Sequence, residues 1–248
     1  FAHRVMTAGG GATFFIGLTF FPLATFLSLV VGEVLAPQGS NVPNIVRDML
    51  YALVIPLVVG AALGGQLLTR LSYRTVAVTG IVISVVGMAG LASLTPSTPL
   101  WVFWLGFVPV GGVVLPLLPL GFGIGLTFPV FLLAAQNQVS KADVGEAGGL
   151  IQFLQSLGGA VGLSTLASFQ ATRFTALTPA ANAVCATPGP PSPQCLSYLA
   201  SVESALITSY DQTFEVMLGL LVVALAFAFF LRGRLPKGAS ALSVPTSE

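Results

Sequence analysis

The chain has 248 residues, of which 55% are hydrophobic and only 7% are charged, and its formal net charge at pH 7 is +1. A soluble domain carries roughly a quarter of its residues as Asp, Glu, Lys or Arg, so this composition excludes an ordinary soluble domain. Nine basic residues against eight acidic ones also argue against an extended basic surface for nucleic acid.

Long uncharged stretches indicate repeated membrane crossings. No charged side chain occurs in the 66 residues between Arg74 and Lys141. A helix needs about 20 mostly apolar residues to cross the hydrocarbon layer, and six stretches meet that requirement. The sequence therefore predicts an all-α, polytopic bundle with helices at about 11–35, 48–68 and 75–94, within 100–135 and 147–170, and at about 213–231.

The fourth stretch, 100–135, is long and interrupted by prolines, so it allows either one helix or two. Cytoplasmic loops collect Lys and Arg. One crossing leaves seven basic residues inside and two, Arg47 and Arg173, outside, whereas two crossings divide them four against five. We therefore expect one crossing with a Pro/Gly-rich excursion. Residues 1–10 are then a cytoplasmic lead-in, 11–235 the bundle and 236–248 a cytoplasmic tail.

One long external loop is expected at about 171–211. It contains both cysteines, Cys185 and Cys195, ten positions apart. An oxidising exterior favours a disulfide between them, and two free thiols are the alternative. Apolar residues at helical spacing from 196 to 207 predict a short helix on the membrane surface within this loop.

The segment between the second and third stretches resembles a known signature. Gly65, Thr69, Arg70, Ser72 and Arg74 align with the Gly-x-x-x-Asp-Arg-x-Gly-x-Arg pattern of the major facilitator superfamily, with Thr69 in place of the acid and Ser72 in place of the turn glycine. The resemblance implies one half of a fold in which two six-helix bundles enclose a substrate path. It also implies that this loop locks neighbouring helices in one conformational state. Two arginines anchoring a cytoplasmic turn are the alternative.

Glycine-rich segments at 121–129 and 144–162 resemble the 14-helix drug:proton antiporters, the QacA/EmrB-like branch of that superfamily. That branch commonly has an Arg where this chain has Gln155. Small residues four apart let helix backbones approach closely, with or without a role in transport. The predicted packing glycines are Gly145 and Gly149, and Gly158 and Gly162.

By the resemblance, the first and fourth helices line a central cavity, and the second and fifth flank it. An amide in hydrocarbon is costly unless it faces a partner or water, so glutamines in these helices are expected to point inward. Aromatic rings beside a few polar groups suit an amphipathic or cationic aromatic ligand, although contacts between helices or with lipid are the alternative. The candidates for the substrate path are Thr19, Phe20, Thr127, Phe128, Gln136, Gln152, Gln155 and Ser156.

An intramembrane acid usually carries the coupling proton of a transporter. Glu33, near the outer end of the first helix, is the candidate, and an interfacial acid is the alternative. Because the chain begins with Phe1 and reaches its first apolar run early, we expect it to belong to a longer protein. Other coupling acids are then expected in an N-terminal half.

These features together predict a proton-coupled exporter of lipophilic or cationic small molecules, multi-pass in the cell membrane with both termini cytoplasmic. Its expected partners are the substrate, protons, the bilayer and an N-terminal six-helix half. A transporter of another major facilitator branch, for uptake or for metabolites, and a non-transporting scaffold or sensor subunit are the alternatives. No enzyme, cofactor, metal site or nucleic acid is expected, because His3 is the single histidine and no catalytic Ser or His-Glu-x-x-His motif occurs.

Overall fold

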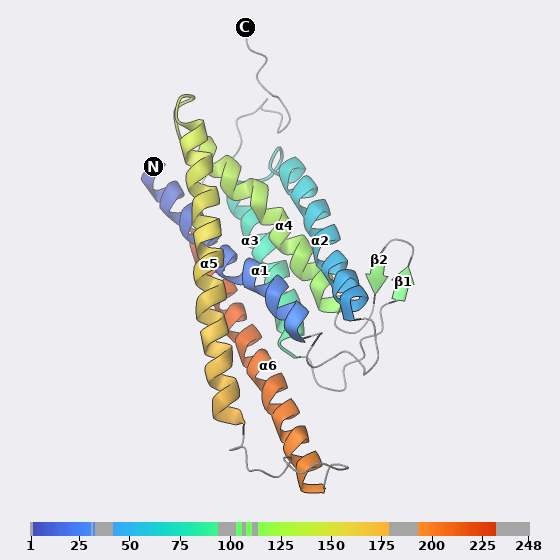
Figure 1. The fold of residues 1–248 in the computed structure, drawn as a ribbon. Coiled ribbons are helices and arrows are strands. Elements are labelled where there is room, and N and C mark those ends of the chain that lie inside the picture. The colour runs from blue at the N-terminus through green and yellow to red at the C-terminus, as the bar shows by residue number, and fades with distance from the viewer. Residues whose placement is uncertain are drawn as a thin grey trace.

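The computed structural model describes residues 2–30, 32, 42–93, 103–105, 108–110, 114–178 and 193–231. These residues contain six helices, each long and apolar enough to cross a membrane, as the sequence predicts (Figure 1). The all-α polytopic bundle is therefore confirmed. The helices are α1 (Ala2–Val30), α2 (Val42–Leu67), α3 (Tyr73–Leu91), α4 (Val114–Gln136), α5 (Val144–Leu177) and α6 (Pro193–Phe229).

The fourth apolar stretch forms one crossing, as predicted, because its first part is a small β-hairpin. Strands β1 (Phe103–Leu105) and β2 (Val108–Val110) pair antiparallel, with Phe103 opposite Val110. Helix α4 then begins at Val114, so Pro116 falls in its first turn, where a missing backbone N–H removes no helical hydrogen bond. Strand β2 contacts α2 and α4, and the hairpin projects beside the lower end of α2 in Figure 1.

Several helices are longer than predicted. Helix α1 begins at Ala2, so residues 2–10 are helical and continue into the first crossing, and their cytoplasmic position stays a prediction. The surface helix predicted at 196–207 is wrong, because this segment is the first part of α6. No Gly or Pro interrupts the apolar pattern between 196 and 217, so nothing ends the helix there.

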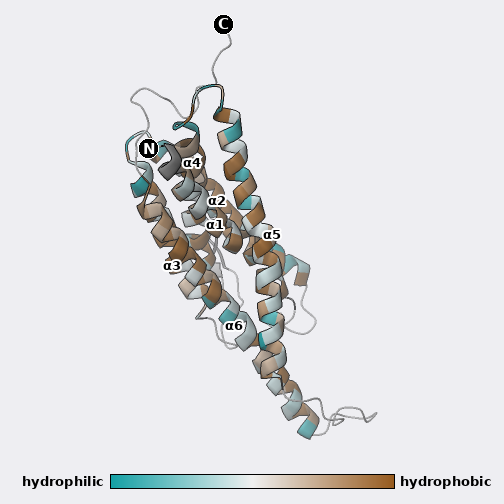
Figure 2. Cartoon of the chain, turned by 90° about the vertical axis from the view of Figure 1, so that its left-hand side faces the viewer, coloured by the Kyte–Doolittle hydropathy of each residue, from teal (hydrophilic) through white to brown (hydrophobic). Residues whose placement is uncertain are grey.

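The predicted 171–211 loop is correspondingly shorter. Residues 171–177 lie in α5 and 193–211 in α6, and the proline-rich part between them lies outside the described residues. Helices of 34 and 37 residues rise about 50–55 Å, whereas the hydrocarbon layer is about 30 Å thick. The two helices extend together beyond the rest of the bundle (Figure 1), and polar residues gather at their ends (Figure 2).

The start of α1, the start of α3 and the ends of α4 and α6 lie together at one end of the bundle. The guanidinium of Arg74 lies 5.3 Å from the ring centroid of Phe229. The side-chain amide of Asn137 donates a hydrogen bond of 2.8 Å to the hydroxyl of Tyr73. A Cβ on Gly9 would lie 3.9 Å from Leu231. The described chain therefore crosses an even number of times and returns to the end where it begins.

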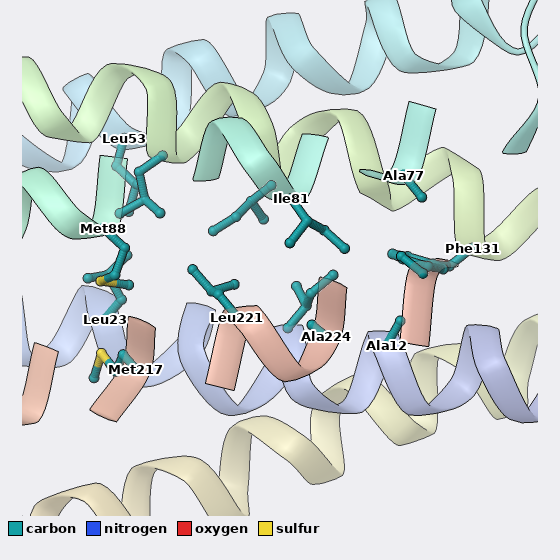
Figure 3. Packing of buried hydrophobic residues seen from close by; sticks show 14 of the residues in the cluster. Ala12, Leu23, Leu53, Ala77, Ile81, Met88, Phe131, Met217, Leu221 and Ala224 are labelled. Atoms are coloured by element: carbon teal, nitrogen blue, oxygen red, sulfur yellow. The ribbon is translucent and has the colours of Figure 1, made fainter. Parts of the chain in front are cut away.

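The core lies where α1, α3, α4 and α6 meet. Met88 of α3 and Met217 of α6 lie near Leu23 of α1, and Ile81 of α3 faces Leu221 of α6 (Figure 3). All five side chains are almost completely buried. Side-chain contacts of this kind hold α6 on α1 and α3.

Glycines bring α5 against α1 in a different way. A Cβ on Gly17 would overlap the carbonyl oxygen of Gln155, and a Cβ on Gly158 would overlap the carbonyl oxygen of Phe14. Such overlap means that the two backbones already touch, which only a residue without a side chain allows.

The two predicted glycine pairs of α5 differ in their surroundings. Gly158 and Gly162 lie against the α1 backbone. In contrast, Gly145 and Gly149 have no described atom within 4 Å of the position that a Cβ would take, so this pair makes no close contact within the described chain and its role in packing stays a prediction. Both are exposed, whereas Ala147 and Gly148 between them face α4 or are buried.

Helix α4 is packed in the same close manner between α2 and α3. A Cβ on Gly121 or Gly125 would overlap carbonyl oxygens of α2, and one on Gly60 of α2 would overlap a carbonyl oxygen of α4. On the other side, Gly87 of α3 and Gly123 of α4 fit against backbone atoms of the facing helix. The bundle thus contains two sets of helices in backbone contact, α1 with α5, and α4 with α2 and α3.

Candidate substrate pocket

A pocket of about 410 Å³ lies between these two sets of helices. Helices α1 and α5 supply one side, and α2 and α4 supply the other. A volume of this size matches the lower end of the range for small-molecule sites. The lining residues are Thr13, Ile16, Phe20, Phe21, Ala61, Thr127, Phe128, Pro129, Phe131, Leu132, Ile151, Gln152 and Gln155.

Aromatic rings form the contact between α1 and α4 at the pocket. The rings of Phe20 and Phe128 meet edge to face, with centroids 5.8 Å apart and planes at 87°. Phe21 packs in the same manner on Phe20, with centroids 5.5 Å apart. Edge-to-face pairs contribute about 0.5–1.5 kcal/mol each beyond the burial of their area, so this wall is held in place before any ligand binds.

The threonine hydroxyls of the pocket donate within their own helices. The hydroxyl of Thr13 donates to the carbonyl of Gly9 at 2.8 Å, and that of Thr127 donates to the carbonyl of Ile124 at 2.7 Å. Neither hydroxyl proton is therefore left for a ligand.

The side-chain amides of the two glutamines of the pocket, unlike the threonine hydroxyls, are not used within their own helix. Gln155 is only 6% exposed, and no described residue forms a hydrogen bond with its amide. Within the described residues, the oxygen and nitrogen of the Gln155 amide are not among the completely buried polar atoms that lack a hydrogen-bond partner. Both atoms are therefore slightly accessible from the pocket. Gln152, one turn earlier on α5, lines the same pocket and is exposed. The glutamine amides thus provide the unengaged side-chain hydrogen-bond donors of the described pocket.

The structure brings together five of the eight candidates for the substrate path: Phe20, Thr127, Phe128, Gln152 and Gln155. The other three lie elsewhere. Thr19 is completely buried and its hydroxyl donates to the carbonyls of two preceding residues in α1. Gln136 lies against Gly148 at the end of α4, and Ser156 is exposed on another face of α5.

Three of the four lining residues of α1 and α5 that were not among the candidates follow from helical spacing. Thr13 and Ile16 lie seven and four positions before Phe20, and Ile151 lies four positions before Gln155. Positions separated by three, four or seven residues share one face of a helix. The spacing from the polar and aromatic candidates was therefore the signal for these residues. Phe21, beside Phe20, has no such signal.

The turn between α2 and α3 contains the residues that resemble the superfamily signature. The hydroxyl of Thr69 donates to the carbonyl of Gln66 at 2.7 Å, so the residue at the acid position caps its own turn. Arg70 is exposed and Gly65 has open space beside it. Arg74 lies over the ring of Phe229, and within the described residues no carboxylate pairs with either arginine.

Two other sequence predictions fall partly or wholly outside the described residues. Glu33, the candidate for proton coupling, is not among them, and neither is Cys185. Cys195 is buried and carries no free thiol. The pairing of these two cysteines stays a prediction.

Six apolar helices, four of which line a pocket, define a multi-pass membrane protein with space for a small molecule. No protein-family model matches the chain. The chain is 27% identical over 235 residues to a triacylglyceride transporter of Mycolicibacterium hassiacum, an alignment that covers 86% of this chain and 43% of that protein. It is 25% identical over 173 residues to the multidrug transporter protein MdtP of Bacillus subtilis, covering 70% of this chain and 29% of that protein.

The chain spans less than half the length of these curated relatives. Both relatives are named as transporters.

Proposed function

We propose that the chain is one six-helix half of a proton-coupled exporter for lipophilic small molecules. The observation that carries the proposal is the aromatic pocket with an unpaired, buried amide. A polar group without a partner at membrane depth is unfavourable, so its presence points to a ligand path. The names of the two similar proteins, one a lipid transporter and one a multidrug transporter, support a lipophilic substrate.

The mechanism that we infer is alternating access between two bundles of the major facilitator type. The resemblance of the α2–α3 turn and of the glycine-rich helices to that superfamily and to its QacA/EmrB-like branch supports this inference. Large apolar side chains of the helices beside the pocket are exposed, such as Val58 of α2 and Phe153 of α5, each 60% exposed. A second bundle, encoded in the same longer protein, would cover part of this surface and complete the pocket.

We propose the cytoplasm for the end of the bundle that contains Arg70, Arg74 and Lys141. Arg47 and Arg173 lie at or towards the other end. An excess of basic residues marks the cytoplasmic side of bacterial and eukaryotic membrane proteins. The long extension of α5 and α6 then lies outside the cell membrane.

An efflux assay tests the proposal. Cells that express the complete reading frame are loaded with a fluorescent lipophilic dye, with and without a protonophore. We expect less dye to accumulate than in cells with empty vector, and the protonophore to abolish the difference. Phe128→Ala, which opens the aromatic wall, is expected to change the efflux rate, and Phe230→Ala, an exposed phenylalanine at the end of α6 and away from the pocket, serves as the matched control.

Three outcomes contradict the proposal. Greater accumulation of dye in the expressing cells indicates an uptake carrier, and equal accumulation of a range of lipophilic dyes indicates a scaffold or sensor. Efflux that continues unchanged when the proton gradient is removed contradicts proton coupling.

A further inference from the structure

We propose that Gln155 is the residue that determines ligand specificity in the pocket. Its side-chain amide donates a hydrogen bond to an uncharged carbonyl group, of an ester or an amide, on an otherwise apolar ligand. This inference rests on the proposed function, because it names the substrate class of the same pocket.

The backbone of α5 is fixed at this residue. The carbonyl of Gln155 touches α1 at Gly17, and Gly158, one turn later, touches α1 at Phe14. Backbone contacts on both sides of one helical turn leave little freedom for Gln155 to withdraw from the pocket. Binding therefore orders only the side-chain torsions of Gln155 and not the backbone that carries it.

The other groups that line the pocket do not compete for this role. The hydroxyls of Thr13 and Thr127 donate to carbonyls of their own helices. Backbone N–H groups in the middle of helices are also occupied. Gln152 is exposed and lies at the edge of the pocket. Gln155 is almost completely buried, so it offers its hydrogen bond where water competes less.

The charge of the pocket argues for a neutral ligand group. No charged side chain occurs among the described residues that line it. A cationic group transferred from water to such a site is left without a counter-charge, which is far more costly than transfer of a carbonyl that gains a hydrogen bond. The apolar part of the ligand would pack on Phe20, Phe128 and Ile151, which lie in the same lining.

A pair of matched ligands tests the proposal by binding alone. One is a fluorescent long-chain ester, and the other is its ether analogue, which lacks the carbonyl oxygen. Both are titrated into purified protein from the complete reading frame. We expect the wild-type protein to bind the ester about fivefold more tightly, the ratio that one net hydrogen bond provides. In Gln155→Met, which keeps the length of the side chain and removes the donor, we expect a ratio of about one.

Gln138→Met, the same substitution in the turn after α4 and away from the pocket, is expected to retain the preference for the ester. Because Gln155→Met replaces an unpaired amide, the thermal unfolding temperature of the variant should not fall. If Gln155→Met does not fold, Gln155→Leu is titrated in its place.

The outcomes separate the inference from the proposed function. If both ligands bind and the wild-type protein shows no preference, or if Gln155→Met keeps the preference, the assignment of Gln155 is wrong while the exporter proposal stands. If neither ligand binds and no dye is exported by cells that express the protein, the proposed function fails and the inference fails with it.

Discussion

Substituting Gly87 by Ala is expected to separate α3 from α4. A Cβ at this position would lie 2.6 Å from the backbone nitrogen of Leu120 and 2.7 Å from the carbonyl oxygen of Pro116, whereas ordinary contacts begin at 3.4 Å. The two helices must therefore part by about 0.8 Å, the difference between 3.4 and 2.6 Å. Overpacking of this kind costs about 1–3 kcal/mol, and replacing a helical Gly by Ala recovers about 0.5–1 kcal/mol.

The net loss is therefore about 0–2.5 kcal/mol, and a loss near the middle of this range corresponds to a thermal unfolding temperature about 4 °C lower in detergent. The control is Gly219→Ala in α6, where nothing lies within 4 Å of the new Cβ, so only the gain in helix propensity remains and the temperature should rise by about 2 °C. A second change, Leu120→Ala, should not rescue Gly87→Ala, because the closest atom is backbone. An unfolding temperature for Gly87→Ala at or above that of Gly219→Ala would refute this account of the interface.

Three further predictions follow from other contacts. Asn137→Ala should lower stability by about 1 kcal/mol by removing the donor to the buried Tyr73 hydroxyl, and the loss should vanish in a Tyr73→Phe background, as a double-mutant cycle by thermal unfolding would show. Arg47→Gln removes an exposed ion pair of 2.8 Å and should shift the unfolding temperature by less than about 2 °C; a larger shift means the pair is not screened by water. A cysteine at Lys141 should resist a membrane-impermeant maleimide in intact cells while a cysteine at Leu177 reacts, and the reverse pattern would invert the proposed topology.

The number and order of the helices could be predicted from the sequence because hydrocarbon imposes a simple requirement. Every crossing needs about 20 apolar residues, and basic residues mark one side. The same two rules correctly reduce the proline-rich fourth stretch to one helix. The ends of the helices follow weaker rules. The start of α6 at Pro193 was missed because its polar first half resembles a surface helix, although nothing between the halves breaks the helix.

The candidate site was predicted in its chemistry and less well in its geometry. Residue type and helix position indicated Gln155 and Phe128, both of which line the pocket. Whether a threonine serves the pocket or its own helix depends on the rotation of that helix, and Thr19 donates to the α1 backbone. Glycine patterns likewise do not reveal whether a neighbouring helix is present. The same spacing therefore predicted close packing for both Gly158, which touches α1, and Gly149, which has no described neighbour.

The backbone contacts at glycines concentrate the genetic vulnerability of this protein in a few codons. Any missense change in a glycine codon adds at least a methyl group, so at Gly17, Gly121 and Gly125 every such error pushes one helix away from another. At Gly65 and Gly219 the same errors meet open space. After random mutagenesis and selection for folded protein, substitutions should therefore be rare at the first set of codons and frequent at the second.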